Sequence, residues 1–159
     1  MHCNIYQIYE EPLDCEDWMD ADFLSDSPLW GTVANHIDDV RDRGAVLQSF
    51  EKWLTEHGLG TLANEAFVLC EHGRNEYFSK RYPAFQKAVS ALCNFTLLQF
   101  TDDFNELHDR IADLEKTVAD KYDAYILWGM TELMPIDEFL RTAKTDNPYY
   151  IGGICSYQF

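Results

Sequence analysis

The clearest pattern in the chain is a helical repeat of apolar residues in its second half. Between residues 102 and 121 these residues recur at spacings of three and four, at Phe104, Leu107, Ile111, Leu114 and Val118. Thr101 is a suitable N-cap, and Asp102 and Asp103 complement the positive end of a helix dipole. The pattern predicts an amphipathic helix from Asp102 to about Lys121.

Four further helices are predicted, over residues 28–40, 45–57 and 83–92 and over a short stretch from Pro135. Ser27-Pro28 offers an N-cap followed by proline at the first helical position, where its missing N–H is not needed. Gly58 is a typical C-terminal stop for the second of these helices.

Runs of β-branched and aromatic residues predict strands at residues 4–9, 66–70, 95–100, 123–128 and 149–159. Gly152-Gly153 interrupts the last run and predicts a bulge or tight turn. Residues 76–82 have two interpretations that stay open, a hairpin partner of the strand at 66–70 or part of a helix capped by Asn75. If their two strands are parallel neighbours, residues 95–128 are expected to form a right-handed β–α–β crossover.

Helices and strands interleave along the whole chain, without an internal repeat or a convincing linker. The expected fold class is α+β, with one domain over residues 1–159 and a mixed sheet of four to six strands on which four or five helices pack. The domain divides into a strongly acidic N-terminal part, residues 1–40, and a main body, residues 41–159.

The charge of the chain restricts its partners. There are 28 acidic against 12 basic residues, a net charge of −16, and residues 1–40 contain ten acids and no base. A chain of this charge repels phosphates and anionic lipids, so we expect neither direct nucleic-acid binding nor membrane binding. The expected partner is a basic protein surface.

The five cysteines, Cys3, Cys15, Cys70, Cys93 and Cys155, are an odd number without a C-x-x-C pair. This pattern is typical of free thiols in a reducing compartment. The N-terminus lacks the basic and apolar regions of a signal peptide, and the apolar runs are far shorter than the roughly 20 residues of a membrane span. The sequence therefore predicts an unanchored cytoplasmic protein.

Two stretches of the chain match known chemical motifs by letter but not in context. Residues 58–63 match a dinucleotide-binding pattern by letter but follow a predicted helix, so a helix end and loop are expected there. Asp20, Asp22 and Asp26 suggest a calcium loop, but Leu24 stands where a third oxygen ligand belongs. The sequence thus predicts no catalytic residue, no metal site and no cofactor.

Cys70 and His72 are the best candidates for chemistry, since residues two apart on a strand share one face and a thiolate–imidazole pair can act as a nucleophile. Cys70 also lies in an apolar run, and we expect it in the core. Paired carboxylates such as Asp137-Glu138 are expected in solvated first turns or on exposed helix faces.

Two acidic surfaces remain as candidate binding sites. The first is a stripe on the predicted helix from Asp102, with carboxylates within about 60° of one another at a step of 100° per residue. Its members are Asp102, Glu106, Asp109, Asp113 and Asp120. The second is an N-terminal block in which aromatic residues can anchor an interface, with Asp17, Trp18, Asp20, Asp22 and Phe23 as the central residues.

In composition the chain resembles the small acidic inhibitors made by phages and mobile elements, which imitate the phosphate backbone to block nucleic-acid-handling enzymes. The leading hypothesis is therefore a non-catalytic acidic protein that binds a basic surface of a protein partner, such as a nuclease. One alternative is a small intracellular enzyme with an unrecognised site at Cys70 and His72. Another is a structural or oligomerisation domain that uses its aromatic C-terminal strand.

Overall fold

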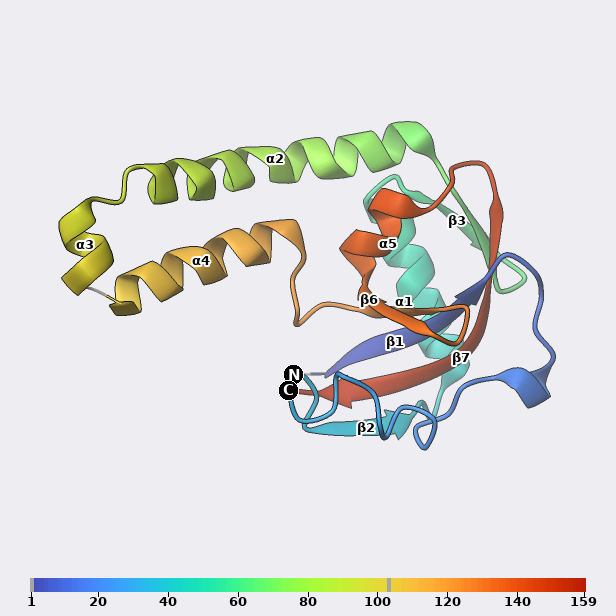
Figure 1. The fold of residues 1–159 in the computed structure, drawn as a ribbon. Coiled ribbons are helices and arrows are strands. Elements are labelled where there is room, and N and C mark those ends of the chain that lie inside the picture. The colour runs from blue at the N-terminus through green and yellow to red at the C-terminus, as the bar shows by residue number, and fades with distance from the viewer. Residues whose placement is uncertain (1, 103) are drawn as a thin grey trace.

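The computed structural model describes residues 2–102 and 104–159. The fold is an α+β domain built on a mixed sheet (Figure 1). Its seven strands are β1 (His2–Tyr9), β2 (His36–Asp39), β3 (Gly60–Ala63), β4 (Ala66–Leu69), β5 (Tyr125–Trp128), β6 (Glu132–Pro135) and β7 (Pro148–Gln158). The helices are the 3-10 turn η1 (Cys15–Asp17), α1 (Arg43–Glu56), α2 (Glu71–Cys93), α3 (Leu97–Asp102), α4 (Phe104–Val118) and α5 (Ile136–Thr142).

The long C-terminal strand β7 organises the sheet, whose order is β3-β4-β7-β1-β5-β6 with β2 also paired to β7. Only β1 and β5 run parallel among these pairs. Between Tyr6 and Ile8 the register of β1 against β7 shifts, so that Gln7 lies opposite both Gly152 and Gly153. Two residues opposite one define a β-bulge, and the predicted bulge at the glycine pair is confirmed.

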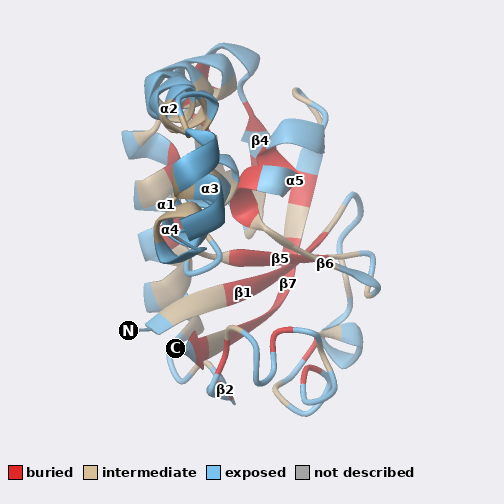
Figure 2. Cartoon of the chain, turned by 60° about the vertical axis from the view of Figure 1, so that its left-hand side comes forward, coloured by how far each residue is buried: buried red, intermediate tan, exposed pale blue. Residues whose placement is uncertain are grey.

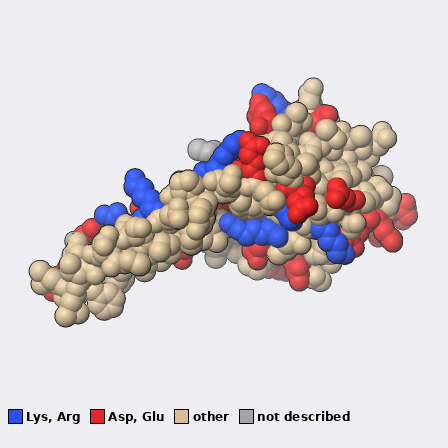
Figure 3. Space-filling model, turned by 90° about the horizontal axis from the view of Figure 1, so that it is seen from above, with Lys and Arg blue, Asp and Glu red and all other residues tan. Residues whose placement is uncertain are grey.

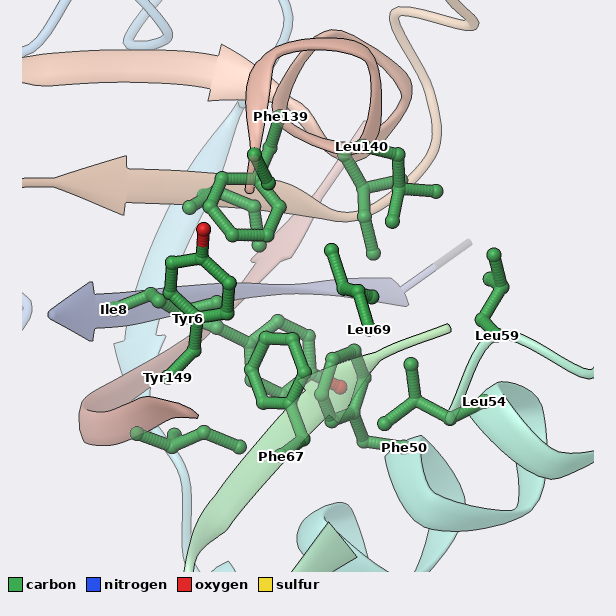
Figure 4. Packing of buried hydrophobic residues seen from close by; sticks show 14 of the residues in the cluster. Tyr6, Ile8, Phe50, Leu54, Leu59, Phe67, Leu69, Phe139, Leu140 and Tyr149 are labelled. Atoms are coloured by element: carbon green, nitrogen blue, oxygen red, sulfur yellow. The ribbon is translucent and has the colours of Figure 1, made fainter. Parts of the chain in front are cut away.

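The two faces of the sheet bury different layers, as the alternation along β1 shows. Tyr6 and Ile8 face a core with α1 and α5, in which Phe67 packs edge-to-face on Phe50 and at a tilt on Tyr149 (Figure 4). Ile5 points to the opposite face, where the loop between β1 and β2 supplies the cover instead of a helix. This second core explains how an acidic segment can fold onto the sheet.

The helices α2, α3 and α4 form an arm that extends from the domain (Figure 1). Tyr77 and Gly73 near the start of α2 are buried against the body, whereas no described residue of α3 or α4 is buried (Figure 2). Helices α2 and α4 pack against each other along the arm. The arm therefore consists of a helical hairpin with a short helix at its tip.

The expected α+β class is confirmed, with five α-helices in the described residues and one strand more than the expected range. Strands at 4–9, 66–70, 123–128 and 149–159 and helices at 45–57 and from Pro135 are present within a few residues. Strands β3 and β6 were not predicted, because both are short and half-exposed. The stretch 58–63, expected as a helix end and loop, becomes the hairpin strand β3 after Gly58 ends α1.

The predicted helix over 28–40 is wrong. One turn forms after Ser27, but Gly31 has a φ of +74° and stops it, and the chain then enters β2 beside β7. Val33, Ile37 and Val40 are β-branched, which favours a strand, and Ile37 is buried in β2 opposite Tyr157. Tertiary pairing overrides the local helical spacing here.

The predictions for residues 76–100 need two corrections. Of the two interpretations of residues 76–82 the helical one is present, but α2 runs from Glu71 through Pro83 to Cys93, so its N-cap is Cys70 instead of Asn75 and no helix begins at Pro83. Residues 95–100 are not a strand: Thr96 and Gln99 form a reciprocal capping box, with both backbone-to-side-chain bonds present, and α3 follows. The predicted β–α–β crossover over 95–128 is therefore wrong.

The amphipathic helix predicted over 102–121 is present but shorter. It spans Phe104–Val118 as α4, while Thr101 and Asp102 end α3 instead of capping α4. The expected role of Asp103 lies outside the described residues.

Candidate partner-binding surface

The acidic loop, residues 10–35 between β1 and β2, is anchored by apolar side chains at irregular intervals. Met19, Leu24, Leu29 and Ala34 are buried against Ile5 and Tyr157 of the sheet. The acids near Met19 and Leu24 in the sequence, Asp20, Asp22 and Asp26, cannot be buried without a partner, and all three are exposed to solvent. The loop thus has an apolar inner side and an acidic outer side.

Gln7 fixes the loop on the sheet. Its side chain is fully buried, and its Oε1 accepts hydrogen bonds from the backbone N of Met19 (2.9 Å) and Gly153 (2.6 Å). Its Nε2 donates to the carbonyl oxygen of Asp17 (3.0 Å). A Cβ at Gly153 would overlap the Met19 backbone, so glycine is required where the loop crosses the bulge.

A second anchor joins the loop to the start of α1. The guanidinium of Arg43 lies 4.1 Å from the centre of the Trp18 ring and donates to the carbonyl oxygens of Ile151 and Gly152. Arg43 also pairs with Glu65 at 3.0 Å. Because these partners occupy Arg43, it offers little compensation to the carboxylates of the loop.

We define the acidic face as the ten carboxylates of residues 1–40, all of them exposed: Glu10, Glu11, Asp14, Glu16, Asp17, Asp20, Asp22, Asp26, Asp38 and Asp39. Glu10 pairs with Lys144 (3.4 Å) and Asp38 with His36 (2.9 Å). The other eight have no ion-pair partner in the part of the chain that the structure describes. The acidic face is therefore strongly negative, and ion pairs within the described residues compensate only two of its ten carboxylates.

The two aromatic residues predicted as interface anchors differ in position. Phe23 is 45 % exposed and available to a partner. Trp18 is half-buried beneath Arg43, a contact that holds the loop to the start of α1, and its indole N–H is buried without an acceptor among the described residues. Trp30, which the sequence argument did not select, is 46 % exposed on the same loop.

The predicted acidic stripe does not form a continuous surface. Asp102 belongs to α3, and Glu106 pairs with Arg110 at 3.3 Å. Asp120 accepts a hydrogen bond from the backbone of Tyr122 and lies 4.0 Å from Lys116. Only Asp109 and Asp113 remain as exposed members of the stripe on α4.

Asp113 faces bases rather than solvent alone. Between α2 and α4 lies a groove of about 480 Å³ whose floor is formed by Ala84, Ala88 and Ala91. Five cations line it with Asp113: Lys80, Arg81, Lys87, Arg110 and Lys116. Nearly half of the chain's 12 basic residues thus gather beside the helix that was expected to be the acidic one.

Cys70 and His72 are both exposed, which contradicts the expected core position of Cys70. The strand β4 ends at Leu69, and Cys70 is instead the N-cap residue of α2. His72 lies in the first turn of α2, and no hydrogen bond joins the two side chains. All five cysteines are free, and Cys155 is the buried one.

The structure reveals a buried polar cluster that the sequence argument assigned to solvent. Asp137 is only 1 % exposed, and its Oδ1 accepts hydrogen bonds from Tyr77 Oη (2.8 Å) and from Arg81. Its Oδ2 is buried without a hydrogen-bond partner among the described residues. Burial raises the pKa of Tyr77, with the Asp137 charge as the next cause, and burial likewise raises the pKa of neighbouring Asp123. These contacts join α5 to the base of the arm.

Neither a metal centre nor a membrane span is indicated by the geometry. Residues 2–102 and 104–159 contain no group of three or more His, Cys, Asp or Glu side chains that could hold a metal ion. Within the same residues, no helix combines the length and apolar character needed to cross a bilayer. Comparison of the chain with protein-family models, curated protein sequences and solved structures gives no significant match. The assignment of a function therefore rests on the surfaces described above.

Proposed function

We propose that the protein is a non-catalytic binding protein whose acidic face docks on a basic surface of a protein partner. The observation that carries this proposal is the exposure of all ten carboxylates in residues 1–40, eight of which have no ion-pair partner among the described residues. Like charges that lie close together repel one another and destabilise the folded state. A loop whose buried side chains hold such charges at the surface therefore favours a role in binding. Phe23 and Trp30 supply the apolar contacts that a stable complex needs beyond charge.

A nucleic-acid-handling enzyme is the class of partner that fits best. Such enzymes bind phosphates through Lys and Arg side chains, and a rigid array of carboxylates can form ion pairs with the same side chains. Rigidity is supported by the buried bonds of Gln7 and the stacking of Arg43 on Trp18. On this proposal the protein acts as an inhibitor that competes with nucleic acid.

The test begins with affinity capture from the native host and continues with purified components. We expect the variant Asp14→Asn, Asp17→Asn, Asp22→Asn, Asp26→Asn to bind the captured partner about tenfold or more weakly at low salt, mainly through slower association. Its fold should be retained, because none of these side chains makes a hydrogen bond or ion pair in the described structure. Calorimetry at two salt concentrations gives the affinity, and thermal melting gives the stability.

The matched control removes the same number of exposed carboxylates elsewhere: Glu51→Gln, Asp109→Asn, Glu115→Gln and Glu138→Gln. At ~0.1 M salt it should bind the partner within about threefold of wild type, since long-range charge is then screened beyond a Debye length of ~10 Å. Equal weakening by both variants would show that only net charge matters. Tight, salt-independent binding by the acidic-face variant would overturn the proposal.

A further inference from the structure

The arm carries most of the exposed apolar surface of the protein. Seven of the eleven large hydrophobic side chains that are exposed in the described residues belong to it. Four form its tip: Leu97, Leu98, Phe100 and Phe104, which are 62–78 % exposed. Contiguous exposed surface of this kind marks an interaction site in a soluble protein, because leaving it in water is unfavourable.

The apolar residues of α4 stay exposed because of the orientation of this helix on α2. The apolar stripe of α4 is centred near Ile111 and Val118. The side of α4 that faces α2 lies next to this stripe and includes Arg110 and Thr117. As a result Ile111 and Val118 stay 43 % and 42 % exposed, and only Leu107 and Leu114 are half-covered. The partner helix thus covers part of the stripe and leaves the rest open.

The arm consequently has two unlike flanks. On one, Lys80, Lys87 and Arg110 line the basic groove between α2 and α4. On the other, Phe78, Tyr82 and Phe85 of α2 meet Val118 of α4 around a second, mostly apolar pocket, which Arg81 and Arg141 also line at the base of the arm. A helical pair with one apolar flank completes a core when a second layer packs on that flank.

We infer that the apolar flank and tip of the arm bind the same surface of a second copy of this chain. The two arms would pair as a two-fold dimer, in which each surface is its own complement. Four helices then enclose one apolar core, as in a four-helix bundle.

The distribution of charge favours a second copy as the occupant. Residues 71–118 hold eight acids and six bases, whereas the rest of the chain holds 20 acids and six bases. We call the chain outside residues 71–118 the body. The bodies of two copies repel each other, whereas two arms carry little net charge and can meet. In Figure 3 the outer part of the arm is mostly uncharged, and acidic side chains gather over the body.

Antiparallel arms also keep the two acidic bodies apart. The part of α2 beyond Arg81, from Tyr82 to Cys93, extends about 18 Å at 1.5 Å per residue. This distance approaches two Debye lengths at ~0.1 M salt, so most of the repulsion between bodies is screened.

The area is sufficient for a stable dimer. Taking about 150–250 Å² for a whole aromatic side chain and somewhat less for an aliphatic one, the exposed parts of the seven residues amount to roughly 800 Å² per copy. A standard interface buries about this area on each partner. The arm thus offers an interface of ordinary size without any change in fold.

The direct test is sedimentation equilibrium of the full chain from ~1 to ~100 µM, a range that resolves dissociation constants of that order. We expect a monomer–dimer equilibrium that strengthens severalfold between low and moderate salt, because salt screens the bodies and not the apolar contact. Leu98→Glu and Phe104→Glu, made singly, should each weaken the dimer by at least about 100-fold, since each change occurs twice in a two-fold interface.

Val68→Glu is the matched control, because Val68 is an exposed apolar residue (42 %) of the body. It should leave the association constant within about threefold of wild type. All three variants should keep a folded far-ultraviolet spectrum, which separates loss of association from loss of fold.

A chain that remains monomeric throughout the concentration range would overturn the inference. So would a dimer that tolerates both tip variants, or a monomer that binds lipid vesicles or another protein through Leu98. These results are independent of the acidic-face variants, so failure here leaves the proposed function standing, and the reverse also holds.

Discussion

Asp137 connects the arm to the body, and its removal should loosen that connection. The carboxylate accepts hydrogen bonds from Tyr77 Oη (2.8 Å) and from the guanidinium of Arg81. The centre of this guanidinium lies 4.8 Å from the centre of the Tyr77 ring. Tyr77 and Arg81 are in α2, whereas Asp137 is in the first turn of α5. Asp137→Ala therefore breaks the polar contact between these two helices.

The expected loss follows from the burial of each group. Removing one partner of a fully buried ion pair costs about 3–5 kcal/mol. The side chain of Arg81 is 33 % exposed and can be rehydrated, so the loss should be smaller, about 2–3 kcal/mol with the unpaired Tyr77 hydroxyl included. At about 2–4 °C per kcal/mol for a chain of this size, the melting temperature should fall by roughly 5–10 °C.

The assay combines thermal melting with hydrogen exchange of peptides from α2. Exchange should increase near Tyr77 and Arg81 in the Asp137→Ala variant, because the base of the arm opens locally. Glu138→Gln is the control, since Glu138 lies in the same first turn of α5 but is exposed. It tests for a simple loss of charge at the helix N-terminus.

An unchanged melting temperature in Asp137→Ala would refute this reasoning. It would mean that the desolvation of Asp137, whose Oδ2 has no hydrogen-bond partner among the described residues, already cancels the pairing energy. The difference between wild type and variant should also persist at high salt, because buried pairs are screened far less than exposed ones.

Two further measurements test the electrostatics of the interior. Burial raises the pKa of Asp123 above its ordinary value of 3.8, so the folded state binds that proton more tightly and loses stability as pH rises through the raised pKa. Asp123→Asn, which keeps the acceptor for the backbone of Ala124, should therefore raise the melting temperature at about pH 7 but not near pH 3.5, and equal gains at both would contradict the assignment. Burial raises the pKa of the Cys155 thiol to about 12, whereas Cys70 is exposed. A thiol reagent, followed by mass spectrometry of peptides, should therefore label Cys70 in the native protein and Cys155 only in denaturant. Labelling of both cysteines at one rate in the native protein would contradict this assignment.

Four of the strands, β1, β4, β5 and β7, and the exposed N-terminal carboxylates could be predicted because their signals are local. β1, β5 and β7 are dense runs of aromatic and β-branched residues, and the glycine pair in β7 marks its bulge. The exposure of the N-terminal carboxylates follows from the cost of burying a charge without a partner. None of these inferences needs knowledge of which segments meet in space.

The errors arise where distant segments decide the outcome. Ile37 lies in a strand because Tyr157 is beside it, and Asp137 is buried because Tyr77 and Arg81 reach it from 60 and 56 residues away. Their sequence neighbours carry no sign of either contact. The capping box at Thr96 and Gln99, in contrast, was present in the sequence and would have predicted α3 instead of a strand.

The two proposals together give a reason for the uneven charge of the chain. A body with 20 acids against six bases cannot associate with its own copies, but it is suited to a basic partner; the arm, with eight against six, has the opposite preference. A dimer joined by its arms would present two acidic faces at opposite ends. A partner with two basic sites at a matching distance would then be bound far more tightly than by one face, because the second contact becomes intramolecular. Leu98→Glu should consequently weaken binding to such a partner even though Leu98 does not touch it, and it should leave binding to a single-site fragment unchanged.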